Sequence, residues 1–392
     1  MGPRIVLHTG KGGVGKTSVA AATARRAAAT GARTLVFSTD PAHSLADVLD
    51  IEIGSKPTQA GDRLWAEQVQ AQAEIERNWA SVRDWLSAQL LRRGADRITA
   101  EEITVPPGLD ELLALLRLRR HADSDEFDVV VVDCAPTGET LRLLSLPDVA
   151  RWWLDRVVPA HERGALNAAR PFSRAVLDVA LPDDDAIADV TGVVRGVLEM
   201  GDVLRDAERV SVRLVMTPER LAVDEARRTF TYLNLYGFPV DAVVVNRVFP
   251  AEVGEYFDGW RERQEEELED VAAAFAPVPV LRAPYFAEEV RGPAMLDRLG
   301  DEAFGDLDPA AILHTGAAER LELSEDAARL HLPLPLAERG DVSLRQVGSE
   351  LVVRVDGYKR TLMLPPALQG WSARGAELAD GALTVDLEAP VP

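Results

Sequence analysis

A stretch of eight residues near the N-terminus has the residue types and spacing that phosphate binding requires. It fits the pattern G-x-x-x-x-G-K-[ST] and stands between a β-branched run and an alanine-rich stretch, the strand–loop–helix context of a phosphate-binding loop. Glycines let backbone N–H groups converge on phosphate oxygens, and the following helix points its positive end at the same anion. The motif consists of Gly10, Lys11, Gly12, Gly13, Val14, Gly15, Lys16 and Thr17.

The polar side chains of this loop have separate expected roles. We expect Lys16 to place its charge on the β- and γ-phosphates of ATP, and the Thr17 hydroxyl to bind Mg²⁺. Ser18 completes the same binding segment. Lys11 is a second lysine inside the loop. In a face-to-face dimer it reaches the phosphates bound across the interface, as an arginine finger supplied in trans does; the alternative is a solvated loop lysine.

Two further segments carry an aspartate where a strand is expected to end. Asp40 lies in the sequence STDPAHS at 38–44, at a carboxyl end where open α/β sheets bind ligands, so it is a candidate to activate the attacking water. Asp133 follows four valines and is the candidate Mg²⁺ ligand, directly or through water. Gly138, in the next few residues, is able to move as the γ-phosphate comes and goes. A lone aspartate after a strand also serves as a simple cap.

Composition excludes several other classes of function. The 392 residues carry a net charge of −21, and such an acidic surface repels nucleic acid and anionic lipid. The single cysteine, Cys134, allows no disulfide, no cysteine-based zinc site and no iron–sulfur cluster within one chain. We find neither a signal peptide nor an apolar run long enough to span a bilayer, and expect a cytoplasmic protein.

The elements that must position these residues alternate between strands and helices. The expected strands are 5–7, 34–37, 129–132, 212–216 and 242–245, continuous apolar runs that suit strands covered on both faces. Helices are expected over 16–30, ending at Gly31, and between Pro218 and Gly237. This alternation predicts an α/β fold, a doubly wound and mostly parallel sheet.

Two stretches interrupt the alternation and predict an inserted helical subdomain, at about 65–120 and 149–205. Apolar residues of the first stretch recur at steps of three and four, which gives one helical face. These apolar faces either pack on one another or line a groove for an apolar client. The recurring residues are Ile75, Trp79, Val82, Leu86 and Leu90.

The C-terminal part predicts a small all-β sandwich over 332–392. Strands are expected at 342–346, 351–355, 358–364 and 382–387, with a hairpin turn at Asp356-Gly357. Residues 1–318 are then the ATPase domain, and 319–331 are expected to form a linker or a helix.

Together, the loop at 10–17 and the segments STDPAHS at 38–44 and DCAPTGETLR at 133–142 resemble the arsenite-pump ATPases. That family also contains the ATPases that target tail-anchored membrane proteins. The resemblance covers about 4–292, and the C-terminal part is similar to the α-crystallin-like (small heat-shock) domain of some bacterial and plastid members. It implies an ATP-hydrolysing homodimer that opens and closes, with apolar protein segments as clients; a membrane receptor is a further partner that it allows.

The resemblance also implies roles for individual residues. Lys11 corresponds to the signature lysine that crosses the dimer, and Asp40 to the aspartate that positions the hydrolytic water. Glu219 and Asn246 correspond to positions that hold the nucleoside; the side-chain amide of Asn246 both donates to and accepts from an adenine edge. By a looser alignment, Pro284 and Tyr285 contact the base.

The chain departs from the family pattern at three points. Glu139 stands where the family usually has histidine, which leaves the coupling of this segment to the client open. The Cys-x-x-Cys zinc clip of the eukaryotic members is missing, and Cys134 alone does not supply the thiolates that arsenite needs. One phosphate-binding loop is found instead of two, so that a homodimer is required to bring Lys11 to a second site.

Three functions compete on these residues. The first is a dimeric ATPase that captures and releases an apolar protein segment. The second is the energy-coupling subunit of an anion or metalloid efflux system. The third is a partitioning ATPase, which the acidic composition and the strand-like tail ending in Pro392 disfavour.

Overall fold

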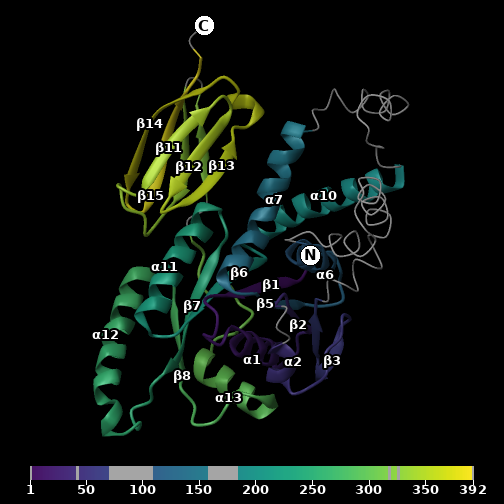
Figure 1. The fold of residues 1–392 in the computed structure, drawn as a ribbon, viewed down its shortest axis with the longest axis vertical. Helices are drawn as coiled ribbons and strands as arrows, with labels where there is room; N and C mark the ends of the chain where they lie inside the picture. The colour runs from purple at the N-terminus through teal and green to yellow at the C-terminus, as the bar shows by residue number, and fades with distance from the viewer. Residues whose placement is uncertain are drawn as a thin grey trace, which may run out of the picture.

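An eight-stranded sheet forms the centre of the chain. The structure is a computed structural model, and it describes residues 2–40, 44–69, 109–157, 184–316, 319–324 and 327–390. The spatial order is β3-β4-β2-β5-β1-β6-β7-β8, and every neighbouring pair is parallel except β3 with β4 (Figure 1). This confirms the predicted doubly wound α/β fold. The strands are β1 (Arg4–Thr9), β2 (Thr34–Ser38), β3 (Thr58–Gly61), β4 (Leu64–Gln68), β5 (Val129–Asp133), β6 (Val210–Met216), β7 (Val240–Val248) and β8 (Val280–Pro284).

The five strands predicted from apolar runs are all present, as β1, β2, β5, β6 and β7. β2, β5 and β6 are buried at every position, which explains why their sequences are apolar without alternation. β3, β4 and β8 were not predicted. They lie toward the two edges of the sheet, where short and partly polar sequences such as TQAG and LRAP suffice.

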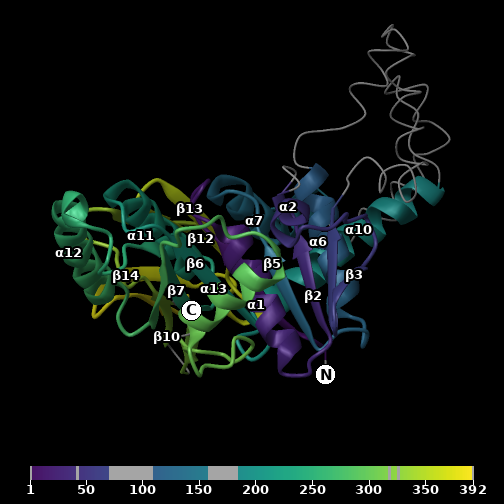
Figure 2. The same ribbon diagram turned by 90° about the horizontal axis from the view of Figure 1, so that it is seen from below.

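The register of the central strands gathers the candidate residues at one edge of the sheet. Asp133 at the end of β5 pairs with His8 of β1 on one side and with Ser38 of β2 on the other. The segments that leave these three strands therefore start side by side. Helix α2 (Ser44–Leu49) lies at this carboxyl edge, opposite the N-terminus of the chain (Figure 2).

Helices cover both faces of the sheet. On one side α1 (Lys16–Ala29) packs against α2 and α13 (Gly292–Phe304); on the other α6 (Leu109–Ala122), α7 (Thr137–Val157) and α10 (Asp184–Leu204) pack together. α11 (Arg220–Leu235) packs on β6, β7 and α12 (Asp258–Phe275). The helices predicted over 16–30 and between Pro218 and Gly237 are therefore confirmed as α1 and α11.

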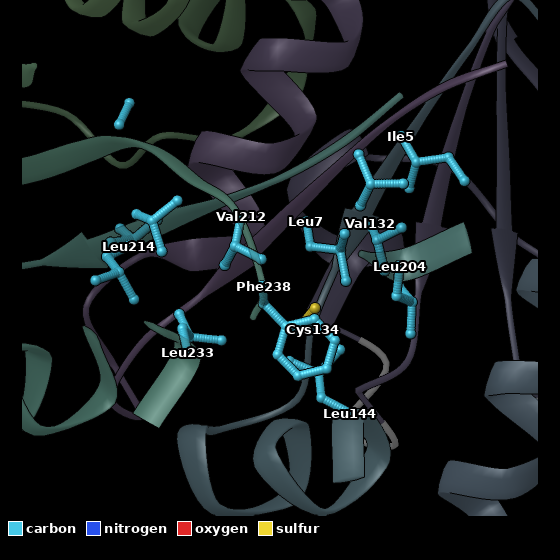
Figure 3. Packing of buried hydrophobic residues seen from close by; sticks show 14 of the residues in the cluster. Ile5, Leu7, Val132, Cys134, Leu144, Leu204, Val212, Leu214, Leu233 and Phe238 are labelled. Atoms are coloured by element: carbon cyan, nitrogen blue, oxygen red, sulfur yellow. The ribbon is translucent and has the colours of Figure 1, made fainter. Parts of the chain in front are cut away.

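The core between sheet and helices is apolar and closely filled. Leu7 and Val132 of the sheet meet Leu144 and Leu204 of α7 and α10, and all four are at most 1% exposed (Figure 3). Cys134 lies among them, 2% exposed, directly after β5. Burial and the neighbouring Asp133 raise the pKa of its thiol to about 12, so that the thiolate needed for metal binding is disfavoured.

Part of the predicted helical insertions lies outside the described residues. This applies to 70–108, with the apolar positions 75–90, and to 158–183. At the start of the first stretch the prediction was wrong, because residues 65–68 belong to the strand β4, which pairs with β2; the described end of that stretch is the helix α6, and the helices α7 and α10 border the second stretch. Val197, Met200 and Leu204 of α10 are buried against the core, so the described end of this helix uses its apolar face for packing.

The C-terminal part is an antiparallel all-β sandwich, as predicted. One sheet has the order β14-β15-β10-β9 and the other β11-β12-β13. The Asp356-Gly357 turn has positive φ at both residues, 45° and 85°, as the predicted two-residue hairpin requires. The strands are β9 (Arg320–Leu323), β10 (Ala327–Pro333), β11 (Val342–Val347), β12 (Glu350–Val355), β13 (Tyr358–Met363), β14 (Ser372–Ala379) and β15 (Ala382–Glu388).

The expectation of a linker or helix at 319–331 was wrong, because this stretch contains β9 and most of β10. Ala328, Leu330 and Leu332 are buried while the residues between them are more exposed, a period of two that belongs to a strand. β14 was also missed. Both segments contain alanine, leucine, glutamate and arginine, residues that favour helix locally, and pairing with β15 overrides that preference.

The sandwich is joined to the α/β part at the end of α11 (Figure 1). The Tyr236 hydroxyl donates to the Lys359 carbonyl at 2.5 Å, and Arg360 donates to the Leu235 carbonyl at 2.7 Å. The connecting segment is also held: Arg4 donates to the Ala310 carbonyl at 2.9 Å.

Candidate active site

The glycines of the loop at 10–17 are required by its geometry. Gly10, Gly13 and Gly15 have positive φ values of 155°, 81° and 92°. A Cβ on Gly10 would lie 2.0 Å from the Val215 carbonyl oxygen, and one on Gly15 would lie 2.3 Å from Nδ2 of Asn246. Gly12 has no neighbour within 4 Å of an added Cβ and is exposed. The loop therefore packs closely on β6 and β7 at its ends and is open in its middle.

The charged and hydroxyl groups of the loop gather at the start of α1. Lys16 is 6% exposed, and its Nζ donates to the Lys11 carbonyl at 3.2 Å. Thr17 Oγ1 lies 3.2 Å from the Ser44 hydroxyl of α2, and Ser18 follows in the same first turn. A helix N-terminus with free N–H groups beside a buried lysine is an anion-binding arrangement.

Asp133 is a buried carboxylate with one oxygen unused. Its Oδ2 accepts from the Ser38 hydroxyl at 3.1 Å, whereas Oδ1 has no hydrogen-bond partner. Complete burial raises the pKa of Asp133 to about 7, although Ser38, Lys16 and Thr17 act to lower it. An unpartnered carboxylate oxygen close to the Thr17 hydroxyl provides the hard oxygen ligands that Mg²⁺ prefers, so the residues fit that ion.

Asp40 lies two residues beyond Ser38, the last residue of β2. Its N–H donates to the Ser38 hydroxyl at 3.2 Å, and its carbonyl accepts from Nε2 of Gln68 at 3.1 Å. Residues 41–43, including His43, lie outside the described part of the chain.

Thr39 joins the two aspartate segments to each other. Its N–H donates to the Asp133 carbonyl at 2.9 Å, and its hydroxyl accepts from the Ala135 N–H at 3.1 Å. Neither bond was predicted, because each joins residues that lie more than ninety positions apart. The consequence is that the segments after β2 and β5 form one hydrogen-bonded unit.

The segment after Asp133 leads directly into α7. Thr137 at its start donates to the Glu225 carboxylate of α11 at 2.9 Å, and Gly138 lies in the first turn with no neighbour within 4 Å of an added Cβ. Glu139 is half-buried and lines a cavity of about 230 Å³, together with Thr39, Asp110, Glu111, Thr140 and Arg142.

Of the predicted nucleoside residues, Asn246 touches the loop. It is 7% exposed; its Nδ2 donates to the Val14 carbonyl at 2.9 Å, and its Oδ1 accepts from the Arg247 N–H at 3.0 Å. Asn246 thus braces the loop, a structural role that the sequence did not reveal.

The other predicted nucleoside residues lie along the same edge of the sheet. Glu219 is exposed and caps α11 through its backbone carbonyl. Pro284 ends β8, and Tyr285 is 51% exposed with its ring 5.8 Å from that of Phe249. The structure brings Asn246 of β7 to the loop, and it places Glu219 after β6 and Tyr285 after β8, the strands on either side of β7.

None of the helices in the described residues combines the length and apolar character needed to cross a bilayer.

Comparison with known proteins agrees with this geometry. Residues 3–304 match the family described as anion-transporting ATPase, and 325–387 match an HSP20-like domain found in ArsA. A protein of Chlorobaculum tepidum, provisionally named arsenical pump-driving ATPase, is 36% identical over 390 residues, 98% of this chain and 96% of its own. A similarly named protein of Aquifex aeolicus is 32% identical over 96% of this chain and 97% of its own.

A more distant relative bears a different name. The Arabidopsis thaliana protein named ATPase GET3B is 29% identical over 316 residues, which are 74% of this chain and 76% of its own. The family match covers far more than half of the chain. The chain is therefore an ATPase that belongs to the anion-transporting ATPase family, with an HSP20-like domain following its catalytic part.

Proposed function

We propose that two copies of this chain bind ATP with Mg²⁺ and use hydrolysis to capture and release an apolar protein segment, such as the tail of a membrane protein. The observation that carries this proposal is the pair of Thr39 hydrogen bonds, which join the Asp40 segment to the Asp133 segment. Both segments continue toward the predicted helical insertions, one through β4 and α6 and the other through α7 and α10. A change at the phosphates therefore has a direct path to the helices.

The residues divide the chemistry among themselves. The loop from Gly10 to Thr17 holds the phosphates, with Lys16 as the fixed charge. Thr17 and Asp133 hold Mg²⁺, which when bound neutralises charge on the β- and γ-phosphates. The Asp40 carboxylate orients the attacking water and accepts its proton. Lys11 reaches the phosphates held by the second copy, which makes the closed dimer depend on the γ-phosphate.

The remaining residues and regions extend this assignment. Asn246 and Glu219 hold the nucleoside, and Pro284 with Tyr285 contacts the base. Residues 1–318 act as the ATPase domain in the cytoplasm, with a membrane receptor as a further partner. The names of the GET3B and ASNA1 relatives are consistent with this assignment.

The experiment compares the wild type with Asp40→Asn and with Asp62→Asn, an exposed aspartate in the turn between β3 and β4. We expect Asp40→Asn to lower kcat about 10²- to 10⁴-fold, as loss of a general base does, while ATP binding is retained. Light scattering should show a dimer that closes with ATP and stays closed in Asp40→Asn. Dimerisation that ignores the nucleotide, or normal hydrolysis by Asp40→Asn, would contradict the proposal.

The client is tested with the trapped variant. Asp40→Asn loaded with ATP and Mg²⁺ should hold a purified single-span tail-anchored protein in solution, and the wild type should release it as ATP is consumed. Retention of unfolded soluble proteins instead would favour a general holdase that uses the C-terminal sandwich. Failure to retain either from a closed dimer would remove the chaperone function.

The second candidate is the energy-coupling subunit of an anion or metalloid efflux system, which the names of the Chlorobaculum and Aquifex relatives favour. For arsenite itself, the chain has one cysteine, and that thiol is buried with a pKa raised to about 12. We therefore expect no change in the ATPase rate on adding arsenite; stimulation would support this alternative.

A further inference from the structure

The end of β4 carries two polar side chains that are almost completely buried. Glu67 is 1% exposed and Gln68 is 2% exposed. Successive residues of a strand point to opposite faces of the sheet, so these two side chains contact different elements. A buried carboxylate and a buried amide are costly unless hydrogen-bonded, which makes their partners informative.

Gln68 is bonded to the Asp40 segment. Its side-chain Nε2 donates to the Asp40 carbonyl at 3.1 Å, and the next N–H, that of Val69, donates to the Ser38 carbonyl at 3.2 Å. The Gln68 N–H itself donates to the Gly54 carbonyl at 3.2 Å. The backbone that carries the Asp40 carboxylate is thus held from β4 by a buried side chain.

Glu67 is bonded to α6. Its Oε1 accepts from Nε of Arg117 at 2.5 Å, and its Oε2 accepts from Nε2 of His121 at 2.8 Å. The His121 ring lies 5.8 Å from the rings of both Phe37 and Phe127. Both carboxylate oxygens of Glu67 therefore accept hydrogen bonds from one helix, and aromatic side chains pack beside this contact.

β4 and α6 are the described elements on either side of residues 70–108 in the chain. Glu67 fixes these two elements to each other, and Gln68, one residue later, fixes β4 to Asp40. A continuous series of hydrogen bonds therefore leads from α6 through Glu67 to β4, and through Gln68 to the carbonyl of Asp40.

We propose that Gln68 is a positioning residue for Asp40, and that Glu67 with Arg117 and His121 couples α6 to ATP hydrolysis. The inference rests on the proposed role of Asp40. Gln68 acts by setting where the Asp40 carboxylate sits relative to the attacking water, and misplacement of such a group by about 1 Å costs up to about a hundredfold in rate.

The first test is Gln68→Met, which keeps the length of the side chain and removes its donor. We expect kcat to fall about ten- to a hundredfold while KM for ATP changes less than about twofold, because the loop at 10–17 binds the nucleotide. The matched control is Gln59→Met, at an exposed glutamine of the neighbouring strand β3, with both constants unchanged. An unchanged kcat, or a kcat and KM that change together, would overturn the proposal.

The second test separates positioning from general support of the fold. In the Asp40→Asn background, Gln68→Met should lower kcat by less than about twofold further, because the group it positions is already lost. Two effects that multiply would show that Gln68 acts independently of Asp40 and would refute the inference. If Asp40→Asn alone hydrolyses ATP normally, the proposed function fails instead, so the two failures are distinguishable.

The third test addresses α6. Glu67→Gln keeps the shape of the side chain but removes the charge that binds Arg117 and His121, and we expect kcat to fall about two- to tenfold with KM unchanged. This loss should disappear in the Gln68→Met background, because β4 then no longer holds Asp40. Full additivity of the two changes would argue against a path through β4.

Discussion

The region of the parallel sheet and the C-terminal sandwich differ in how many polar side chains they bury. The sheet region buries His8, Asp133, Arg213 and Asp241 completely, and it buries Glu67 and Gln68 almost completely. Among the described residues after 319, Arg360 is the polar side chain that is buried, and it serves the contact with α11. The strands β10, β12 and β15 alternate between buried apolar residues and more exposed ones, whereas β14 is exposed at most of its positions.

The difference shows which part of the fold accepts the free-energy cost of burying polar groups, and that part contains the candidate active site. Buried polar groups need partners, and the sheet region supplies many of them from distant elements; Oδ1 of Asp133 is one of several buried atoms there that have no partner. The described part of the sandwich buries fewer polar side chains, although Nε2 of His331 is a buried atom there without a hydrogen-bond partner. We therefore expect single substitutions to have larger effects in the sheet region than at comparable positions in the sandwich.

The largest effect on stability is expected at the buried ion pair of β6 and β7. Arg213 and Asp241 are both 0% exposed, with Nε 3.1 Å from Oδ1, and Arg213 also donates to the Ala311 carbonyl. Arg213→Ala leaves Asp241 with one fewer cation inside the protein, and we expect a loss of about 3–5 kcal/mol in the free energy of unfolding. Urea titration measures this; a loss below about 1 kcal/mol would contradict the comparison.

The next effect compares a glycine of each region. Gly10→Ala combines a positive φ with an added Cβ 2.0 Å from a backbone oxygen, so we expect a loss of about 1–3 kcal/mol and weakened ATP binding. Gly357→Ala in the β12–β13 turn meets only the conformational cost, about 1 kcal/mol, because no atom lies within 4 Å. Gly340→Ala, at an exposed glycine outside the loop with no atom within 4 Å of an added Cβ, is the control for nucleotide binding. Equal losses in the free energy of unfolding for Gly10→Ala and Gly357→Ala would contradict the expected difference between the sheet region and the sandwich.

A smaller effect is expected with pH. His8 is fully buried next to Arg213, and both burial and this cation hold its pKa well below 6.5. Below about pH 6.5 the His8 side chain is protonated in the unfolded chain but stays neutral in the folded chain. His8 therefore lowers the free energy of unfolding as the pH falls, by up to about 1.4 kcal/mol per pH unit. Thermal unfolding of wild type and His8→Asn between pH 5 and 8 isolates this slope from other groups such as Asp133. Parallel curves would be evidence against it.

The smallest effect is expected at an ion pair of the sandwich. Arg329 and Asp386 lie 2.8 Å apart, but each side chain is 55% exposed. Arg329→Ala should cost at most about 1 kcal/mol, and less in high salt, because water screens the pair. A urea titration showing more than 2 kcal/mol would mean that exposed pairs stabilise the sandwich as strongly as buried pairs stabilise the sheet.

Local signals accounted for much of the fold. The valine run before Asp133 and the glycines at 10–17 are read from a few neighbouring residues, and the strands and helices they imply are present. The same local reading was wrong at 319–331, where β10 pairs with β15 more than fifty residues away. Local helix propensity is a weak preference that tertiary contacts override, so the distant pairing decides the structure of this segment.

The sequence by itself determined the phosphate-binding loop, the two aspartates at strand ends and the alternation of a parallel sheet, because these depend on spacing along the chain. Only the tertiary structure decided the hydrogen bond from Gln68 to Asp40, the brace from Asn246 to Val14 and the buried pair of Arg213 with Asp241. The sequence does not indicate which partner a glutamine, an asparagine or an arginine inside a strand will bind. The partner is set by which distant strands become neighbours, and that is a property of the folded sheet.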